Sequence, residues 1–455
     1  MLNISLAKRL SRGVLMAGAA AVAFAMVSPA SAQTAIVGNT ATTDTSVGSG
    51  YTGAGVSVSG SASVNALSSF SGTNATVSNA TVNGTGSGLA VSSDGSASAG
   101  GTNAIAIGAG TQASVLNATA LGNSAAANGQ GATALGAGAS ASDTNAVAIG
   151  NAVANGASNS AVGDGAVTSG NNSSAFGAGA QAGGSGSNAS AFGYGSNASG
   201  ANSSAIGGGQ AMGSGAVSVG TGSSVSAASL DGTALGAGAT VSNSLATAVG
   251  YGATASGTAS YAGGTATAGG TSSVAIGNGA STAAAANGSV ALGSGATASA
   301  ASSVALGNGA TASASNSMAF GASASVTATG TNSVALGSDT TTSRANTVSV
   351  GGRTISDLAP GVLGTDAVNV NQLNSAERLL KRGIATSMAM SSIITPSAPG
   401  KTTIGFNGAT YAGYYSAAIN FAHRVNTDVP LYITGAIGAG EAGAVGGRVG
   451  VAVEF

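Results

Sequence analysis

Large apolar residues recur along the chain at a nearly constant interval, and a glycine follows each of them. The copy that runs from Ser302 to Ala312 reads S-S-V-A-L-G-N-G-A-T-A. Its marker glycine, Gly307, has counterparts every 13, 14 or 16 residues from Gly108 to Gly351, with 14 the commonest step. A fixed period of this kind indicates structural coils stacked one on the next, which is the pattern of a solenoid.

Each repeat has room for two strands of about five residues and two tight turns. Val304, Ala305 and Leu306 alternate large, small and large before the turn, and a slimmer strand at 310–312 follows it. Since neighbours in a strand face opposite sides, Ala305 points away from the two large residues. Alanine suits the inside of a narrow roll, and the large face needs a cover that no other part of the chain offers. The repeat therefore predicts a parallel β-solenoid that forms a homo-oligomer.

The expected core of this oligomer consists of large apolar positions in the repeats. The clearest are Val274, Ile276, Val290, Leu292, Val304, Leu306, Val334 and Leu336.

Beyond Arg344 the repeats end and a helical pattern begins at Asp366, where Thr365 or Asp366 is the expected N-cap. The apolar positions of the helix are Val370, Leu373, Leu380 and Ile384. Pro396 and Pro399 end the helix. It is short for an autonomous coiled coil, and an isolated amphipathic helix is the alternative. The self-association that the repeats require favours the coiled coil.

Four strand-like segments follow the helix, at 401–409, 411–422, 429–438 and 445–455. Segments of about ten residues with one apolar face are typical of membrane β-barrels. Four strands cannot close a barrel, but three chains would supply twelve, with the helices in the lumen. A soluble four-stranded sheet is the alternative. The aromatic residues suited to the membrane interfaces are Tyr411, Tyr414, Tyr415, Tyr432 and Phe455.

The N-terminal segment, residues 1–32, reads as a secretory signal peptide. It has a basic start, an apolar core at 14–27 and a small-residue cleavage site after Ala32, which leaves Gln33 as the new N-terminus. The core is too short for a transmembrane anchor. Residues 33–100 are irregular and rich in Gly, Ser and Thr. They are a degenerate start of the solenoid, a cap or a disordered tip, and the sequence leaves these three readings open.

Charge is nearly absent from the repeats: no Lys, Arg, His or Glu occurs between Gln33 and Ser343. General acid–base catalysis needs titratable groups brought together, so we expect neither catalytic residues nor an enzyme. The six scattered aspartates are too few for a metal site in each coil, and the chain has no cysteine; we expect no metal and no cofactor. Without a basic field we expect no nucleic-acid partner.

Motifs in the repeats and beyond them resemble those of one family. The stretch 332–337 (N-S-V-A-L-G) and the stretch 273–277 (S-V-A-I-G) resemble a head motif, and 366–373 (D-A-V-N-V-N-Q-L) resembles a neck motif. The segments 382–385 and 396–401 and the terminal Phe455 resemble a membrane anchor. In this order they are similar to the YadA-like trimeric autotransporter adhesins of the type Vc secretion class.

The resemblance implies a mainly β architecture, with a trimeric left-handed parallel β-roll head. Together with the signal peptide 1–32 and the irregular segment 33–100, which matches no part of the family, it gives head repeats 101–352, neck 353–373, short coiled-coil or lumen helix 374–395, and anchor 396–455. The anchor would be a twelve-stranded trimeric barrel in the bacterial outer membrane, with the head on the cell surface. The implied neck residues are Asp366, Val368, Val370 and Leu373, and Phe455 would be recognised by the outer-membrane assembly machinery.

The implied function is adhesion: binding of extracellular-matrix proteins such as collagen, fibronectin or laminin, attachment to host cells, and self-agglutination. The head motif is associated with collagen binding in the family, but the burial argument makes Val334 and Leu336 trimer-core residues first. One alternative is a structural low-complexity protein of a surface layer or biofilm, without a specific ligand. The other is an exported β-helical enzyme acting on polysaccharide, which would need acids or bases clustered on one face.

Overall fold

The computed structural model describes residues 88–91, 96–184, 188–392 and 394–455. The chain divides into two compact units, Met1–Gly352 and Arg353–Phe455, and each is described by itself. The expected signal peptide, its cleavage site at Ala32 and Gln33, and most of the irregular segment 33–100 lie outside the described residues.

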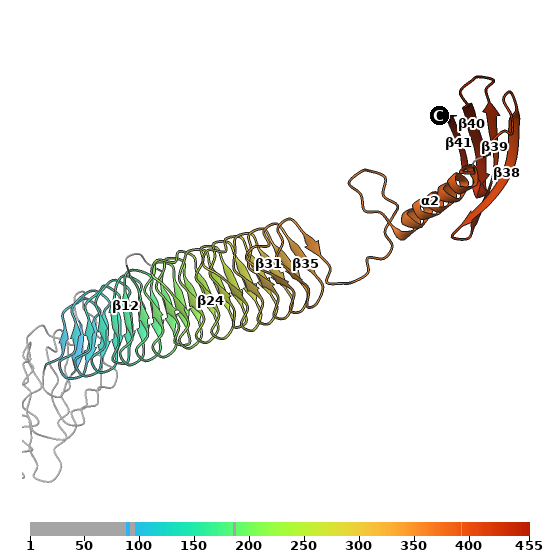
Figure 1. The fold of residues 1–455 in the computed structure, drawn as a ribbon. Coiled ribbons are helices and arrows are strands. Elements are labelled where there is room, and N and C mark those ends of the chain that lie inside the picture. The colour runs from blue at the N-terminus through green and yellow to red at the C-terminus, as the bar shows by residue number, and fades with distance from the viewer. Residues whose placement is uncertain (1–87, 92–95, 185–187, 393) are drawn as a thin grey trace, which may run out of the picture. The chain divides into compact units, whose positions relative to one another are not determined.

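The first unit is a parallel β-solenoid whose coils each contribute one strand to each of two sheets (Figure 1). Strand β31 (Val304–Leu306), for example, pairs in parallel with β29 (Val290–Leu292) and β33 (Met318–Phe320), the equivalent strands of the coils before and after it. The strands have two or three residues, fewer than the five predicted. The corners take the remainder, since each contains residues in the left-handed conformation that end the strand early.

The odd-numbered strands form the first sheet, called here the odd-strand sheet: β1 (Leu89–Val91), β3 (Ile105–Ile107), β5 (Thr119–Leu121), β7 (Thr133–Leu135), β9 (Val147–Ile149), β11 (Ser160–Val162), β13 (Ser174–Phe176), β15 (Ser190–Phe192), β17 (Ser204–Ile206), β19 (Val217–Val219), β21 (Thr233–Leu235), β23 (Thr247–Val249), β25 (Tyr261–Gly263), β27 (Val274–Ile276), β29, β31, β33, β35 (Val334–Leu336) and β37 (Val348–Ser349).

The even-numbered strands form the even-strand sheet: β2 (Ser98–Ala99), β4 (Gln112–Ala113), β6 (Ala126–Ala127), β8 (Ser140–Ala141), β10 (Val153–Asn155), β12 (Val167–Ser169), β14 (Gln181–Ala182), β16 (Asn197–Ala198), β18 (Gln210–Ala211), β20 (Ser224–Val225), β22 (Thr240–Val241), β24 (Thr254–Ala255), β26 (Thr267–Ala268), β28 (Ser281–Thr282), β30 (Thr297–Ala298), β32 (Thr311–Ala312), β34 (Ser325–Val326) and β36 (Thr341–Thr342).

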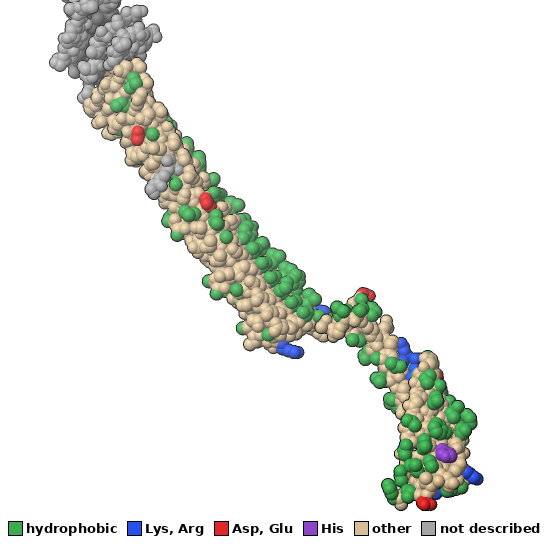
Figure 2. Space-filling view, turned by 90° about the horizontal axis from the view of Figure 1, so that it is seen from above, with side chains coloured by type: hydrophobic (Ala, Val, Ile, Leu, Met, Phe, Trp, Pro, Cys, Tyr) green, Lys and Arg blue, Asp and Glu red, His purple; other side chains and the backbone are tan. Residues whose placement is uncertain are grey.

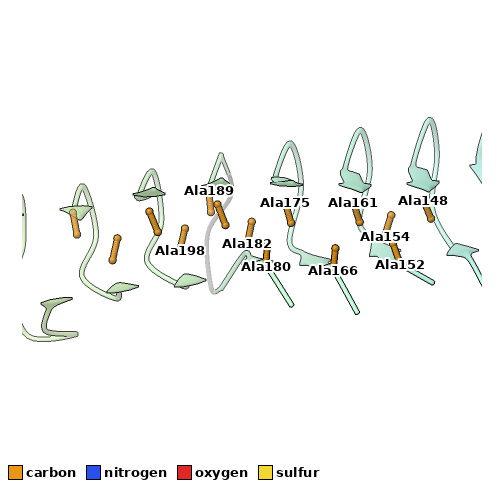
Figure 3. Close-up of a cluster of buried hydrophobic side chains, with 14 of the residues drawn as sticks. Ala148, Ala152, Ala154, Ala161, Ala166, Ala175, Ala180, Ala182, Ala189 and Ala198 are labelled. Carbon is orange, nitrogen blue, oxygen red and sulfur yellow. The ribbon is translucent and has the colours of Figure 1, made fainter. Parts of the chain in front are cut away.

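The core of the solenoid is built almost entirely from alanine. Ala305 on β31 and Ala312 on β32 are both fully buried, and they face each other's sheet from opposite sides of the roll. Figure 3 shows the same arrangement in earlier coils, where alanines from both strands point into the narrow interior. The prediction that the small side of the alternation faces inward is confirmed.

Most of the marker glycines occupy a corner that has no room for a side chain. Gly293 has φ +133°, and a Cβ there would lie 2.5 Å from the carbonyl oxygen of Gly307 in the next coil. At the other corner, Asn332 has φ 56° and joins an amide ladder. Its Nδ2 donates to Oδ1 of Asn346, and its Oδ1 accepts from Nδ2 of Asn316, both at 3.1 Å. Asparagine tolerates this backbone conformation better than most residues, and the ladder adds hydrogen bonds between coils.

The solenoid begins earlier than the predicted boundary at residue 101. Strands β1 and β2 pair with β3 and β4 in the register of later coils. The segment Leu89–Val91 has the large, small, large alternation, but Ser92 stands where the marker glycine would be. Counting coils by glycine therefore missed this one.

The second unit consists of one long helix and a four-stranded antiparallel sheet. Helix α2 (Val370–Met390) is followed by β38 (Thr402–Tyr411), β39 (Tyr414–Arg424), β40 (Leu431–Gly440), the 3-10 turn η1 (Glu441–Gly443) and β41 (Val445–Val453). The strands form a meander, so that β38 and β41 each have one unpaired edge. The four strands confirm the predicted segments, with ends that shift by a few residues. No helix within the described ranges is long and apolar enough to cross a membrane.

Helix α2 starts at Val370, four residues after Asp366, so the expected N-cap at Thr365 or Asp366 is wrong. The cap is Asn369, whose side chain accepts from the amide of Gln372, while Gln372 Oε1 accepts from the amide of Asn369. This reciprocal pair is a capping box, which satisfies two free amides at once. The helix therefore takes in the last four residues of the predicted neck, and it ends at Met390 rather than near residue 395.

Candidate adhesive and self-association surfaces

The large apolar residues of the repeats form two columns on the outer face of the odd-strand sheet. In β31, Val304 and Leu306 point outward on either side of the buried Ala305. Strand register aligns Ile276, Leu292 and Leu306 in one column. The structure thus brings the predicted core residues together. Val274, Val290, Val304, Leu306 and Val334 are half-buried, and Ile276, Leu292 and Leu336 are 38%, 40% and 47% exposed.

The width of the apolar face varies along the solenoid, since strands such as β3 and β9 have two large apolar outward residues and others have only one. From β11 to β17 the first outward position of each odd strand is serine, so each coil presents only one large apolar residue. In this stretch Phe176 and Phe192 stack with ring centroids 5.2 Å apart. From β27 to β35 both outward positions are large and apolar. Figure 2 shows hydrophobic side chains as a stripe along one side of the repeats, beside a surface made mostly of other side chains and backbone.

The outer face of the even-strand sheet is polar instead. Its outward position is Ser, Thr, Asn or Gln in most coils, as at Gln210, Thr240 and Thr311. The two faces of the roll therefore differ in chemistry although they share the same alanine interior. Burial of the apolar face between copies leaves the polar face and the corners in contact with water.

Charge does not interrupt the apolar face. Among the described residues of the repeats before Arg344, the charged side chains are Asp143, Asp164, Asp231 and Asp339, all of them exposed. Within the same part of the chain no group of His, Cys, Asp and Glu is placed to hold a metal ion. An uncharged face suits contact with identical copies, because a charge at one position would meet the same charge on its neighbours.

The neck is a loop held to the start of helix α2 by two side chains. The carboxylate of Asp366 accepts from the amides of Val362, at 2.9 Å, and Leu363, at 2.8 Å. Both hydrogen bonds lower the pKa of the Asp366 carboxyl, and the one from Leu363 has the larger effect. Gln372 accepts from the amide of Gly361 at 2.9 Å and donates to its carbonyl oxygen at 2.8 Å.

The three other predicted neck residues extend outward without a cover in the single chain. Val368, Val370 and Leu373 are 66%, 69% and 62% exposed. Sequence reasoning missed Asn369 and Gln372 as the residues that organise this loop. The signal was present as N-V-N-Q, since an asparagine three residues before a glutamine is the capping-box spacing.

Helix α2 has two apolar faces, and only one of them is covered. Ala385, Ala389 and Met390 are buried against the sheet, and Thr386 Oγ1 lies 2.9 Å from Ser416 Oγ of β39. Glycine makes room for the helix, because a Cβ on Gly438 would lie 2.8 Å from Met390 Cγ. The other face, with Leu380, Ile384 and Met388, is exposed in the single chain. That face has the spacing expected for contact with helices of other copies.

Phe455 lies two residues beyond the end of β41 and its side chain is fully exposed. The prediction that it ends the last strand is therefore wrong by these two residues. Tyr194 and Tyr251, both at a corner of the solenoid, are further residues that the sequence reasoning did not single out. Their signal was a bulky aromatic residue between two glycines, where other coils have small residues.

Family models match both the repeats and the segment that follows them. The model of the YadA head domain repeat matches eight stretches: 99–125, 127–152, 154–180, 185–209, 268–296, 284–310, 298–324 and 328–354. A model described as the coiled stalk of trimeric autotransporter adhesin matches residues 354–387. The chain belongs to the YadA-like trimeric autotransporter adhesins.

Among solved structures, this adhesin is similar to the collagen-binding domain of the Yersinia adhesin YadA. The two are 31% identical over 39% of this chain and 84% of that chain, with a TM-score of 0.25. No curated protein sequence is significantly similar to the adhesin. The head-repeat matches lie in the solenoid, and the stalk match takes in the neck and most of helix α2.

Proposed function

We propose that this adhesin is anchored in the bacterial outer membrane, displays a trimeric head on the cell surface and binds extracellular-matrix proteins there. The observation that carries the proposal is the contrast between the two sheets of the head. One outer face is apolar, uncharged and in register over many coils, which suits burial between copies. The polar face and the corners then remain free for a ligand.

The proposed anchor is a twelve-stranded barrel to which each chain contributes four strands. Its support is the meander β38–β41, whose two outer strands have unpaired edges and whose exposed side chains include Phe406, Val449 and Val451. Edges of this kind are not tolerated in lipid, and pairing with neighbouring copies removes them. The exposed face of helix α2 would then meet its counterparts from the other two chains in the lumen. We assign Phe455 to recognition by the outer-membrane assembly machinery.

The proposed ligands are collagen, fibronectin or laminin, and the same head surfaces would promote self-agglutination of cells. The near absence of charge in the head supports a ligand held by apolar contacts and neutral hydrogen bonds rather than by ion pairs. It also argues against chemistry on a substrate, since catalysis by acids and bases needs titratable groups close together.

A solid-phase panel tests this function. Full-length trimer in detergent is added to immobilised collagen, fibronectin, laminin and serum albumin, and bound protein is measured as a function of concentration. We expect saturable binding to at least one matrix protein and none to albumin. Cells that display the chain should also settle faster than cells without it. Equal signals on the matrix proteins and on albumin would refute the proposed matrix binding.

A further inference from the structure

Two tyrosines stand out from the head surface. Tyr194 is 84% exposed and Tyr251 is 77% exposed, whereas other aromatic residues of the described repeats, such as Phe176 at 37% and Phe192 at 42%, are much less exposed. Both tyrosines occupy the middle of a Gly-Tyr-Gly turn, at the corner where an odd strand passes into the following even strand. Tyrosine presents a rigid apolar ring at low cost in side-chain entropy, which makes an exposed one a common contact residue.

The two rings lie in one column of the solenoid, separated by small residues. Between them the same corner position is held in turn by Gly208, Thr221 and Ala237. Backbone hydrogen bonds link this column from coil to coil: the amide of Gly238 donates to the carbonyl oxygen of Thr221 at 3.0 Å, and that of Gly252 to Ala237 at 2.9 Å. Tyr194 and Tyr251 are therefore two protruding aromatic side chains, and the three corners between them have small side chains or none.

The spacing of the rings follows from the solenoid. Tyr251 is four coils beyond Tyr194. Neighbouring strands lie about 4.8 Å apart, so the two corners are about 19 Å apart along the solenoid axis. A polyproline II chain rises about 3.1 Å per residue, so six residues, or two Gly-X-Y triplets, also span about 19 Å. A ligand of that geometry would present the same position of its triplet to both rings.

Neutral hydrogen-bonding groups run beside the column. The outward residues of the even strands next to it are Asn197, Gln210, Ser224 and Thr240. A polyproline II chain makes no hydrogen bonds within itself, so its outward carbonyl oxygens are free to accept from such side chains. The absence of Lys and Arg between Gln33 and Ser343 removes the charges that a sulfated glycan would need.

We propose that Tyr194 and Tyr251 form a two-ring binding site for a proline-rich chain in the polyproline II conformation, such as a collagen-like triple helix. Proline rings pack on exposed aromatic rings, and the preformed conformation lowers the entropic cost of binding. The inference rests on the proposed matrix-binding function and assigns that function to one corner of the head.

The test uses full-length trimer in detergent and an immobilised triple-helical peptide of repeated Pro-Pro-Gly triplets. We expect Tyr194→Ala and Tyr251→Ala each to weaken binding about tenfold, as truncation of a central aromatic contact commonly does, and the double variant to weaken it further. Tyr194→Phe keeps the ring and should bind as the wild type does. Sedimentation must show the variants to be trimers.

A shifted variant tests the spacing. Tyr251→Ala combined with Ala237→Tyr keeps two rings at equivalent corners but brings them three coils apart, about 14 Å, which is not a whole number of triplets. We expect it to bind like Tyr251→Ala alone. Full binding by the shifted or double variant would overturn the site, as would absence of wild-type binding to the peptide. Loss of the trimer in the double variant would assign the rings to the subunit interface instead.

The proposed matrix binding and the tyrosine site can be refuted separately. A wild-type chain that binds matrix proteins but not the proline-rich peptide overturns the tyrosine site and leaves the adhesive function standing. A wild-type chain that binds the peptide but none of the matrix proteins overturns the proposed ligand of the adhesin. Binding of the peptide that depends on both tyrosines supports the inference.

Discussion

The residues that face the interior of the head are mostly small, because the space between the two sheets is narrow. Most inward positions hold alanine, as at Ala305 and Ala312, and the largest apolar side chains that the interior buries fully are valines such as Val326. Where serine replaces alanine, its hydroxyl needs a partner, and Ser303 Oγ donates to the carbonyl oxygen of Ala300 at 2.6 Å. Among the described residues of the head, Asn159 Nδ2 and Thr168 Oγ1 are buried without a hydrogen-bond partner. Such groups cost stability, so these coils are expected to be weaker than their neighbours.

Adding volume to the interior of one strand should destabilise the head. We expect Ala312→Leu to lower the free energy of unfolding by about 1–3 kcal/mol or more, since the extra carbon atoms have no room between the sheets. The matched control is Thr311→Leu, on the same strand but facing outward, which should change it by less than about 0.5 kcal/mol. Thermal unfolding followed by circular dichroism measures both. Equal effects would mean that the two faces of β32 are assigned wrongly.

Which residues face inward could be predicted from the sequence because the alternation is strict and alanine fits only a narrow interior. Glycine also marked one corner correctly, since its φ of +133° at Gly293 is costly for other residues. The prominence of Tyr194 and Tyr251 could not be read in the same way. The sequence alone does not say whether an aromatic residue at a turn lies in an interface or in solvent. That requires the position of its corner in the column of coils.

Among the elements, helix α2 has three candidate N-cap residues close together in the sequence. Thr365, Asp366 and Asn369 are all residues that cap helices, and the apolar spacing alone does not choose between them. In the structure Asp366 closes its own turn with the amides of Val362 and Leu363, and Asn369 caps the helix. The existence of the helix was predictable from its periodicity, but its start depended on local hydrogen bonds that periodicity does not encode.

The neck turn should open in acid. The hydrogen bonds from the amides of Leu363 and Val362 lower the pKa of Asp366 from its ordinary value of 3.8. The stabilisation that the ionised carboxylate gives to the turn is therefore present above that pH and is lost as the pH falls through the lowered pKa. We expect the protection of the amides of Val362 and Leu363 against hydrogen exchange to fall below about pH 4.

Two controls accompany the exchange measurement. The amide of Gly361 donates to Gln372, which does not titrate, so its protection should change less with pH. Asp366→Asn should leave Val362 and Leu363 with low protection that no longer depends on the titration of this side chain. Unchanged protection of both amides at low pH in the wild type would show that the carboxylate does not hold the turn.

The four strands of the second unit were predictable for a simpler reason. Alternation over about ten residues is a strong signal, and the turns at Gly413 and at 425–430 interrupt it clearly. Sequence alternation did not reveal the row of glycines that lets helix α2 approach β40. Gly438 and Gly440 read as weak strand residues until Thr386 and Met390 are placed against them.

At the scale of the whole molecule, three sets of uncovered groups lead to the same conclusion. The odd-strand sheet has an apolar outer face, helix α2 has a second apolar face, and the sheet β38–β41 has two open edges. One symmetric association of identical chains would cover all three. For the head, self-association could be predicted from the sequence pattern alone. The second apolar face of helix α2 became clear only once the contacts of the helix with the sheet were known.

Labelling of a single introduced thiol shows whether the apolar face of the odd-strand sheet is buried between copies. The chain has no cysteine, so Leu306→Cys and Thr311→Cys each introduce one reporter, and both positions are half-buried in the single chain. In the native full-length assembly in detergent, we expect a maleimide to label the Thr311→Cys variant readily. The Leu306→Cys variant should be protected until the assembly is dissociated. Equal labelling of the two native variants would contradict burial of the odd-strand face between copies.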